Sequence, residues 1–450
     1  RTHNGTQVLM NHELASDKGI VRRHGQEGSF VSKVSLDRTG RVVKAEDFIT
    51  SVRYFSFGSF GDGLGTYQAT PVGTDDARFN RFCSSTLAAA GSLYNRATGR
   101  GTTERIYFAN EEGNDESRVF GVDESGHAVE LPRLGRFATE NSVPAAHSGN
   151  TTVVMGNEDG ATTTSELRVY VGKKERGFGK SPFAKAGLQN GTSHVIAVTD
   201  GVGGLVPSDA AFRAAYGKGD KVRFSLSEVP WDATGAAQNA EADVEGTSFD
   251  RIEDGQWDPR KRNVYYFVTT QGGEGTVQGA GNGGGGGLWR LTYDDVRNPS
   301  AGGTLELLLD GTEAINLVKP DNMTIDGRGN ILLQEDPGNI DAVARIAAYR
   351  IADGALGQIA TFDPALFTPG APRFLTKDEE SSGIIDLEPL GYPAGTFLFD
   401  AQVHTDLGLP ADPDPAADNP GTADEYVERG QLLKLGVADF RSVYTILPVA

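Results

Sequence analysis

Short apolar runs along the chain repeatedly end in amide, acidic or histidine side chains. Five such runs are VLMNHE (8–13), IYFANEE (106–112), VVMGNED (153–159), ILLQED (331–336) and FLFDAQVH (397–404). After a loop, each is followed by a second strand-like segment, at 29–37, 117–123, 166–172, 345–351 and 431–437. A sixth pair of segments, at 264–270 and 287–295, ends its first member in threonines. Apolar runs of this length, bounded by turn residues, predict β-strands.

The repetition of one strand pair predicts an all-β fold, a six-bladed β-propeller in which each blade repeats a strand meander around a central channel. Six blades with insertions account for the 450 residues as a single domain, 1–450. Radial assembly brings equivalent strand ends to one mouth of the channel. Residues as distant in the sequence as Glu13 and His404 can therefore contribute to one site.

Three segments interrupt the repeat. Residues 173–250, between the third and fourth blades, contain helix-like stretches at 208–216 and 234–243, and we expect them to form a partly helical cap over one face. Residues 272–287 predict a flexible glycine-rich loop, and residues 409–421 predict a proline-rich surface loop.

Composition excludes several classes of partner. The net charge of −19 and the pI near 4.8 argue against nucleic acid and anionic membranes, which require a basic face. No run approaches 18 apolar residues, so we expect no membrane insertion. The single cysteine, Cys83, excludes an intramolecular disulfide, and a lone thiol is most often a small buried core residue. The chain opens at Arg1 without a signal peptide, so an export segment has been removed or left out.

Several acidic strand ends at equivalent blade positions favour a site for hard cations. Two carboxylates that are adjacent in the chain repel each other unless one turns to solvent or a cation lies between them. Such pairs occur at Glu111–Glu112 and at Glu158–Asp159. Glu13, at the end of the first run, is a weak metal candidate by itself. Further ligand candidates are Glu335, Asp336, Glu380 and His404.

The segment RIEDGQWD (251–258) concentrates charge after the long insertion. It is either a surface ion-pair turn or a functional element, with Glu253 on a metal and Arg251 as a bidentate clamp for a tetrahedral anion. The chain has neither a GxSxG elbow nor an HExxH motif. Many carboxylates, one thiol and few histidines suit calcium together with a metal that accepts sulfur, such as iron, better than a conventional zinc site.

The order of these motifs resembles the PhoX family of alkaline phosphatases. NHE is followed by an isolated cysteine, RxEDGxWD, PDNxxxDxxGN, ExSG and a late QxH, from position 11 to position 404. The resemblance implies an exported six-bladed propeller, periplasmic or secreted by the twin-arginine route. It also implies a phosphomonoesterase with a mixed cluster of Fe³⁺ and Ca²⁺.

Site roles follow from the resemblance residue by residue. Cys83 would be the thiolate ligand of iron, with Glu158 and Glu253 as further ligands on the iron side. Arg251 would hold the phosphate. The calcium ligands would be Glu13, Glu112, Glu335 and Glu380. Cys83, Arg251 and Glu253 would then form the catalytic set.

The chain departs from the family around its cysteine. The segment RFCSST (81–86) replaces an Asn-Cys-Ala-Gly-Gly type of sequence, and no lysine lies between Ala45 and Cys83. Either Arg78 or Arg81 replaces the family's substrate-binding lysine, or the second phosphate contact is missing.

The expected partner is a small-molecule phosphate ester, and the expected state is a monomer. Two other functions remain open on the sequence. One is a calcium-dependent propeller hydrolase of the lactonase or phosphotriesterase type, which has no use for Cys83. The other is a non-enzymatic binding propeller stabilised by calcium.

Overall fold

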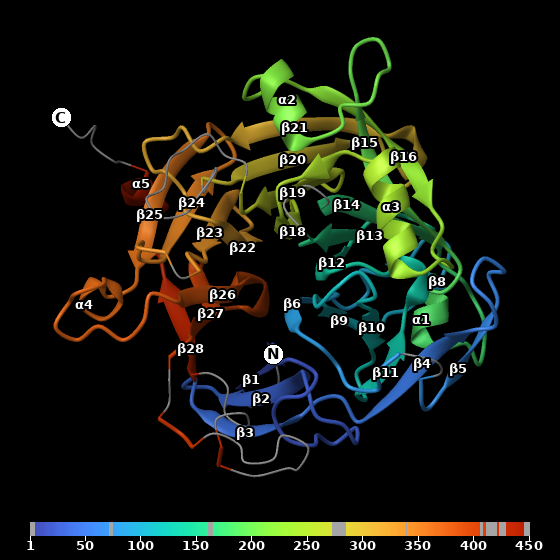
Figure 1. Ribbon diagram of the computed structural model, residues 1–450, viewed down its shortest axis with the longest axis horizontal. Helices are drawn as coiled ribbons and strands as arrows, with labels where there is room; N and C mark the ends of the chain where they lie inside the picture. Colours follow the sequence, from blue (N-terminus) through green and yellow to red (C-terminus); the bar gives the residue numbers. More distant parts are fainter. Residues whose placement is uncertain are drawn as a thin grey trace.

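The computed structural model describes residues 5–71, 75–160, 165–271, 285–338, 340–405, 408–410, 421–422 and 429–444. The sheets stand around a central axis, and the first and last sheets lie side by side (Figure 1). This radial arrangement of antiparallel meanders is that of a β-propeller, so the predicted all-β fold class is confirmed.

Four sheets are separate from one another, and their strand pairs are antiparallel except for one parallel pair in the second sheet. The first has the order β1 (Gly5–His12), β2 (Phe30–Asp37), β3 (Val42–Asp47). The second has the order β5 (Gly65–Gln68), β4 (Ser51–Phe57), β11 (His127–Glu130), β10 (Val119–Val122), β9 (Tyr107–Glu111), β6 (Phe82–Leu87). Another is β22 (Pro320–Ile325), β23 (Asn330–Glu335), β24 (Arg345–Arg350), β25 (Ala355–Thr361). The last is β26 (Glu379–Asp386), β27 (Thr396–Val403), β28 (Arg429–Gly436).

The largest sheet joins two meanders. Its path is β12 (Thr139–Pro144), β13 (Thr151–Glu158), β14 (Ser165–Lys173), β15 (Thr192–Thr199), β16 (Val222–Val229), β21 (Gly303–Leu309), β20 (Gly287–Tyr293), β19 (Val264–Thr269), β18 (Ile252–Trp257). The short strand β17 (Ser248–Phe249) pairs with β14, and β7 (Tyr94–Asn95) pairs with β8 (Arg100–Gly101). The helices are α1 (Pro182–Lys185), α2 (Asp209–Ala215), α3 (Gly235–Glu245), α4 (Pro364–Phe367) and α5 (Phe440–Val443). Short 3-10 turns cover Pro132–Leu134, Pro299–Ala301 and Glu388–Leu390.

The central strands of the meanders are buried on both faces. Every residue of β9, β19 and β23 is buried. A strand packed between two neighbouring sheets has no solvent face, so its sequence is a continuous apolar run rather than an alternating one. This explains the unbroken apolar character of the runs that reveal the repeat.

Hydrophobic clusters fill the spaces between neighbouring sheets. Phe108 and Val154 belong to the cluster between β9 and β13, for example. The ring closes in the same way, because Val8 and Val34 of the first sheet pack against Leu387 and Leu398 at the last sheet. Apolar packing therefore holds the sheets at fixed positions around the axis.

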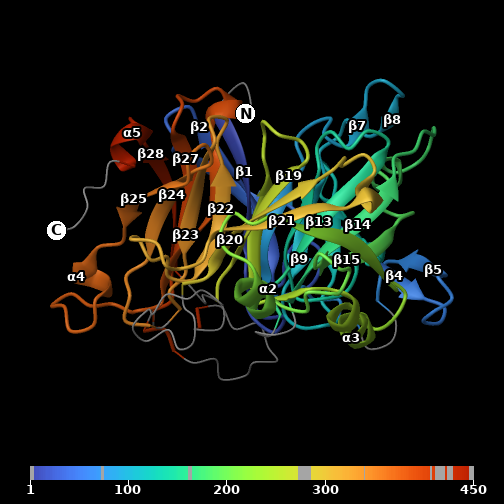
Figure 2. The same cartoon turned by 90° about the horizontal axis from the view of Figure 1, so that it is seen from above.

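The segment 173–250 differs from the expected cap. The helices α2 and α3 lie where the sequence predicts helices, with Ser208 and Thr234 as their N-caps. However, β15 and β16 extend the sheet outward and join it to β21, so much of the segment is strand. Both helices lie at one face of the molecule (Figure 2). The reason is that β15 carries an apolar run and β16 alternates apolar and polar residues, so both form strands that pair with an available sheet edge.

Much of the two predicted loops lies outside the described residues, at 272–284 and 411–420. No helix in the described part of the chain is long and apolar enough to cross a membrane.

Candidate active site

Five strands close to the axis carry a ligand-type residue at the same position. In each, the preceding residue pairs with the last residue of the neighbouring strand, as Phe82 pairs with Glu111 and Pro320 with Glu335. We call the five residues the inner ring: Cys83, Glu140, Glu253, Asp321 and Glu380. Their strands β6, β12, β18, β22 and β26 surround the axis (Figure 1).

Each of these strands is irregular next to its inner-ring residue. In β6, β12, β18 and β22 the register shifts directly after the residue that precedes the ring member, and in β26 it shifts shortly afterwards. A β-bulge changes the direction of the neighbouring side chains, and bulges are frequent beside active sites. In four of the five strands the bulge therefore lies where it can redirect the inner-ring side chain.

A second set of residues directly follows the five strands that pair with the inner ones, together with the equivalent strand β1 of the first sheet. We call it the outer ring: Glu13, Glu112, Asp159, Thr270, Asp336 and His404. In five of the six cases the backbone N–H donates to the carbonyl oxygen two positions before an inner-ring residue, at 2.9–3.0 Å. This repeated hydrogen bond fixes the outer ring next to the inner ring.

Two groups within these rings have the geometry of metal sites. Ligand atoms of Glu13, Cys83 and Glu112 all lie within 4.8 Å of one another. Ligand atoms of Glu140, Glu253 and Asp321 do so as well.

Burial and mutual repulsion oppose ionisation of these acids. Burial raises the pKa of Cys83 and that of Glu253 well above their ordinary values, and nearby carboxylates raise both further. Burial also raises the pKa of Glu140 to about 8, although the neighbouring Ser84 and Cys83 side chains oppose the rise. The buried Oε1 atom of Glu140 has no hydrogen-bond partner among the described residues. Multivalent cations would offset the repulsion and supply a partner for this oxygen, so the residues fit a metal cluster.

Three cationic residues flank the acids, each two positions before an inner-ring residue. Arg81, Arg251 and Lys319 have φ angles of 47°, 59° and 45°, in the left-handed region that non-glycine residues seldom adopt. Arg81 bridges Glu13 and Glu112 at 2.6 and 3.0 Å. The Arg251 Nε atom donates to Asp159 at 2.7 Å, and its Nη2 atom lies 3.1 Å from Glu253. We call these three residues the cation set.

Amide side chains connect three of the meanders to a neighbouring inner strand. The Asn11 Nδ2 atom donates to the carbonyl oxygen of Cys83 at 2.9 Å. Asn157 makes the equivalent bond to the Glu253 carbonyl oxygen, at 2.5 Å. Gln334 donates to the carbonyl oxygen of Ser382 at 3.4 Å, beside Glu380. Amides placed two positions before the outer ring thus hold the backbone at Cys83, at Glu253 and close to Glu380.

The structure brings most of the residues predicted from the sequence to the two rings and the cation set: Glu13, Cys83, Glu112, Glu253, Asp336, Glu380, His404, Arg81 and Arg251. It does not bring three others there. Glu158 binds the Arg168 Nε atom at 2.8 Å, and Glu335 binds Arg345 at 2.6 Å. Each of these two glutamates is the last residue of a strand, where alternate side chains point between the sheets. The third residue, Arg78, pairs with Asp76 and Glu27 instead.

The sequence interpretation did not select five residues of these sets: Glu140, Asp159, Thr270, Asp321 and Lys319. The signal for Glu140, Asp321 and Lys319 is the alignment of the inner strands, RFCS (81–84), ATEN (138–141), RIED (251–254), KPDN (319–322) and DEES (378–381). The third letter is the inner-ring residue in every case.

The arginine partner of Glu158 leads to a test of its structural role. Arg168 is shared with Glu166, 3.7 Å away, and burial raises the pKa of both carboxyl groups. The folded protein then keeps a proton that the unfolded chain releases, so stability falls as pH rises from about 5 to 8. We expect Glu166→Gln to reduce this fall by about 1–3 kcal/mol in urea unfolding.

Metal content should be unchanged in both Glu166→Gln and Glu158→Gln. An unaltered pH dependence in the first variant, or metal loss in the second, would contradict this assignment.

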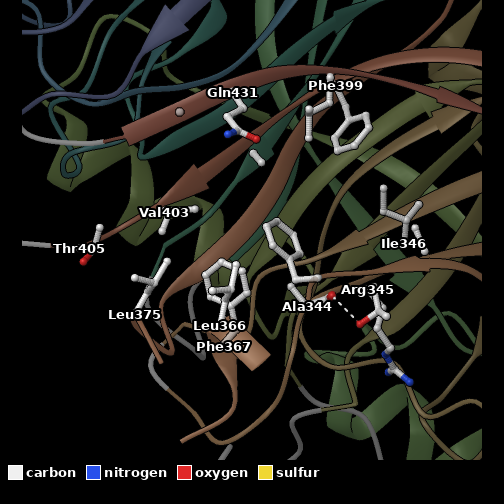
Figure 3. A pocket seen from close by; sticks show the side chains of 16 residues that line it. Ala344, Arg345, Ile346, Leu366, Phe367, Leu375, Phe399, Val403, Thr405 and Gln431 are labelled. Carbon is white, nitrogen blue, oxygen red and sulfur yellow. Dashed lines mark hydrogen bonds between the residues drawn. The ribbon is translucent and has the colours of Figure 1, made fainter. Parts of the chain in front are cut away.

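A cavity of about 640 Å³ lies away from the rings, between the last two sheets and α4. Apolar side chains including Leu366, Phe367, Phe399 and Val403 line it (Figure 3). No ring residue contributes to its wall. Titratable groups, and not cavity size, therefore define the candidate active site.

The family described as "Alkaline phosphatase PhoX" matches residues 79–371. The chain belongs to the PhoX family. It is accordingly a phosphomonoesterase whose family membership implies dependence on metals. A search of curated proteins found no match. Among solved structures, PhoX from Pseudomonas fluorescens in complex with vanadate, a transition-state analogue, is similar over 89% of this chain and 81% of that chain, with 14% identity and a TM-score of 0.54.

Two further structures are similar at lower scores. TolB from Acinetobacter baumannii shares 8% identity over 87% of this chain and 60% of that chain, with a TM-score of 0.32. A putative 6-phosphogluconolactonase from Bacteroides uniformis shares 10% identity over 89% of this chain and 92% of that chain, with a TM-score of 0.35. Of these three structures, the PhoX structure has a TM-score above 0.5 and supports the fold.

Proposed function

We propose that this PhoX-family chain hydrolyses phosphate monoesters with an iron and calcium cluster held by the inner and outer rings. The observation that carries the proposal is a single thiol among buried carboxylates, with arginines beside them. Thiolates suit iron, whereas carboxylates suit calcium. When bound, such a cluster supplies the positive charge that phosphoryl transfer requires.

Cys83 is the proposed iron ligand. The carboxylates of the two three-residue groups would complete the iron site and hold calcium. Asp336 and Glu380 extend this set, because each carboxylate raises the pKa of buried acids near it. His404 lies near Glu380, and its positive charge lowers the pKa of that carboxyl group, opposing the rise that burial causes.

Arg251 is the proposed phosphate clamp. Its guanidinium group already donates in a fork to Asp159, which is the geometry that suits two oxygens of a phosphate. In the transition state it would stabilise charge on the equatorial oxygens. Arg81, held between Glu13 and Glu112, is the proposed replacement for the lysine that the chain lacks before Cys83.

We further propose that the ring has six blades. The supporting observations are the five equivalent inner strands with their meanders, together with the first sheet, whose strand β1 leads to Glu13 in the outer ring. On this count the ten-stranded sheet contains two blades, linked by β15 and β16.

The test is metal analysis combined with an activity assay. Purified protein, without added metal, should contain about one or more iron atoms and an excess of calcium per chain, and should hydrolyse p-nitrophenyl phosphate. Removal of calcium by a chelator should abolish activity, and calcium should restore it. Active protein with calcium but without iron would overturn the iron assignment. Protein that contains both metals and hydrolyses no phosphate monoester would overturn the proposed function.

A further inference from the structure

Lys319 has a backbone conformation that its hydrogen bonding does not explain. Its carbonyl oxygen accepts the Asp336 N–H at 3.0 Å. Ala138 and Asp378, at the same position in two other sheets, accept the equivalent bond at the same distance, yet neither has a positive φ. Lys319 also precedes Pro320, and a following proline restricts the backbone further. Strained conformations of this kind accumulate at functional sites.

The left-handed conformation therefore accompanies a cationic side chain and not the turn itself. In the described residues it occurs at this position only where the side chain is Arg81, Arg251 or Lys319. Two of these three residues already contact the acids of the site.

Lys319 is half-buried, and its positive charge lowers the pKa of the nearby Asp336 carboxyl group, opposing the rise that burial causes. Its amine still has hydrogen-bond donors for a further anion, because it forms no close ion pair with the described residues. Arg81 and Arg251 each contact two carboxylates, whereas no ion pair of Lys319 is present in the described part of the chain. A Cβ atom built on Gly338 would lie 3.4 Å from the Lys319 Nζ atom and 3.7 Å from the Asp336 carboxylate oxygens. The amine thus lies near the outer ring, at the turn that follows Asp336. An ammonium group offers three hydrogen-bond donors and no acceptor.

The strand that follows Lys319 lies beside the strand that follows the phosphate clamp, Arg251. Lys319 precedes β22 as Arg251 precedes β18, and these two inner strands are joined by the Met323 N–H, which donates to Asp254 at 3.1 Å. Two positions after Arg251 and Lys319 come Glu253 and Asp321, and ligand atoms of these two acids belong to the same candidate metal site. A ligand with its phosphate at Arg251 would therefore present a nearby substituent to Lys319.

We propose that Lys319 forms a second anion subsite beside the phosphate position, and that the preferred substrates are phosphate monoesters with a carboxylate close to the ester. The proposal rests on the proposed function and specifies its substrate class. A carboxylate accepts charge-assisted hydrogen bonds from an ammonium group, whereas a neutral hydroxyl group gains less from it.

The test compares 3-phosphoglycerate with glycerol 3-phosphate, which differ in a carboxylate against a hydroxymethyl group. Wild-type protein should have the higher kcat/KM for 3-phosphoglycerate. Lys319→Met should lower the ratio of the two kcat/KM values about tenfold, the effect of losing one charge-assisted hydrogen bond. Lys319→Gly should give the same loss, and glycine tolerates the left-handed conformation, so this variant guards against misfolding.

A binding measurement provides a readout independent of turnover. Calorimetry should show phosphonoacetate binding about tenfold more weakly to Lys319→Met, with a smaller change for methylphosphonate. The control Lys377→Met removes a lysine that pairs with Asp341 at 3.4 Å. It should change neither the ratio of kcat/KM values for the two esters nor the relative affinities for the two phosphonates. If the wild type hydrolyses both esters and neither Lys319 variant changes the ratios, the subsite is refuted. If the wild type hydrolyses neither, the proposed function itself fails.

Discussion

Cys83→Ala is expected to lower phosphatase activity by at least about 100-fold and to remove iron, while the propeller stays folded. The thiol is grouped with Glu13 and Glu112 within 4.8 Å, and it is the chain's single sulfur ligand of the thiolate type. Loss even of residues that merely support metal ligands costs 10–100-fold in affinity or activity, so loss of a ligand should cost more. For wild type and variant, iron per chain tests the loss of metal, kcat tests the loss of activity, and the far-UV circular dichroism spectrum tests whether the propeller stays folded.

Ser85→Ala is a suitable control, because Ser85 lies on the same strand and its hydroxyl accepts from Tyr107 at 2.7 Å. Its iron content and activity should match those of the wild type. Full activity and normal iron in Cys83→Ala would return this thiol to the role of a small core residue.

Arg251→Ala is expected to reduce kcat/KM by about 100- to 1,000-fold, the range measured when a transition-state donor is removed. The inhibition constant of inorganic phosphate should rise, because the clamp contacts phosphate in the ground state as well. The metal content should stay the same, since the guanidinium group contacts the acids but is no ligand. Arg251→Lys should recover part of the activity, as it keeps the charge and loses the planar fork.

Arg78→Ala is the matched control for the Arg251 variants. Arg78 is held by Asp76 at 2.7 Å and by Glu27 at 3.1 Å, outside the two rings. Its removal should change neither phosphate inhibition nor activity. Unchanged phosphate inhibition in Arg251→Ala would rule out the clamp.

The sequence predicted the strand ends well but could not decide between adjacent acids. Glu111 and Glu112, Glu158 and Asp159, and Glu335 and Asp336 are consecutive pairs. Because side chains alternate along a strand, a difference of one position sends the carboxylate to the other side. The first of each pair binds an arginine of the returning strand, as Glu111 binds Arg118 at 2.8 Å. Those arginines were visible in the sequence, and they identify which acid is structural.

The inner strands were harder to find. Glu140 and Asp321 lie on short, bulged strands of polar character, so neither hydrophobic periodicity nor an apolar run marks them. Their similarity becomes clear only when the five segments are aligned in the register that the structure shows. Lys319 was hidden for a different reason, since its role depends on a left-handed backbone that has no sequence signature at a lysine.

The hydrogen bonds donated by the side-chain amides of Asn11, Asn157 and Gln334 affect how metals bind to the site. These hydrogen bonds hold the backbone at Cys83, at Glu253 and close to Glu380. The conformational entropy of arranging the ligands is therefore lost when the chain folds and not when a metal arrives. A frame preorganised in this way would discriminate between ions by size and charge, because it has little freedom to contract around a smaller ion or to expand around a larger one.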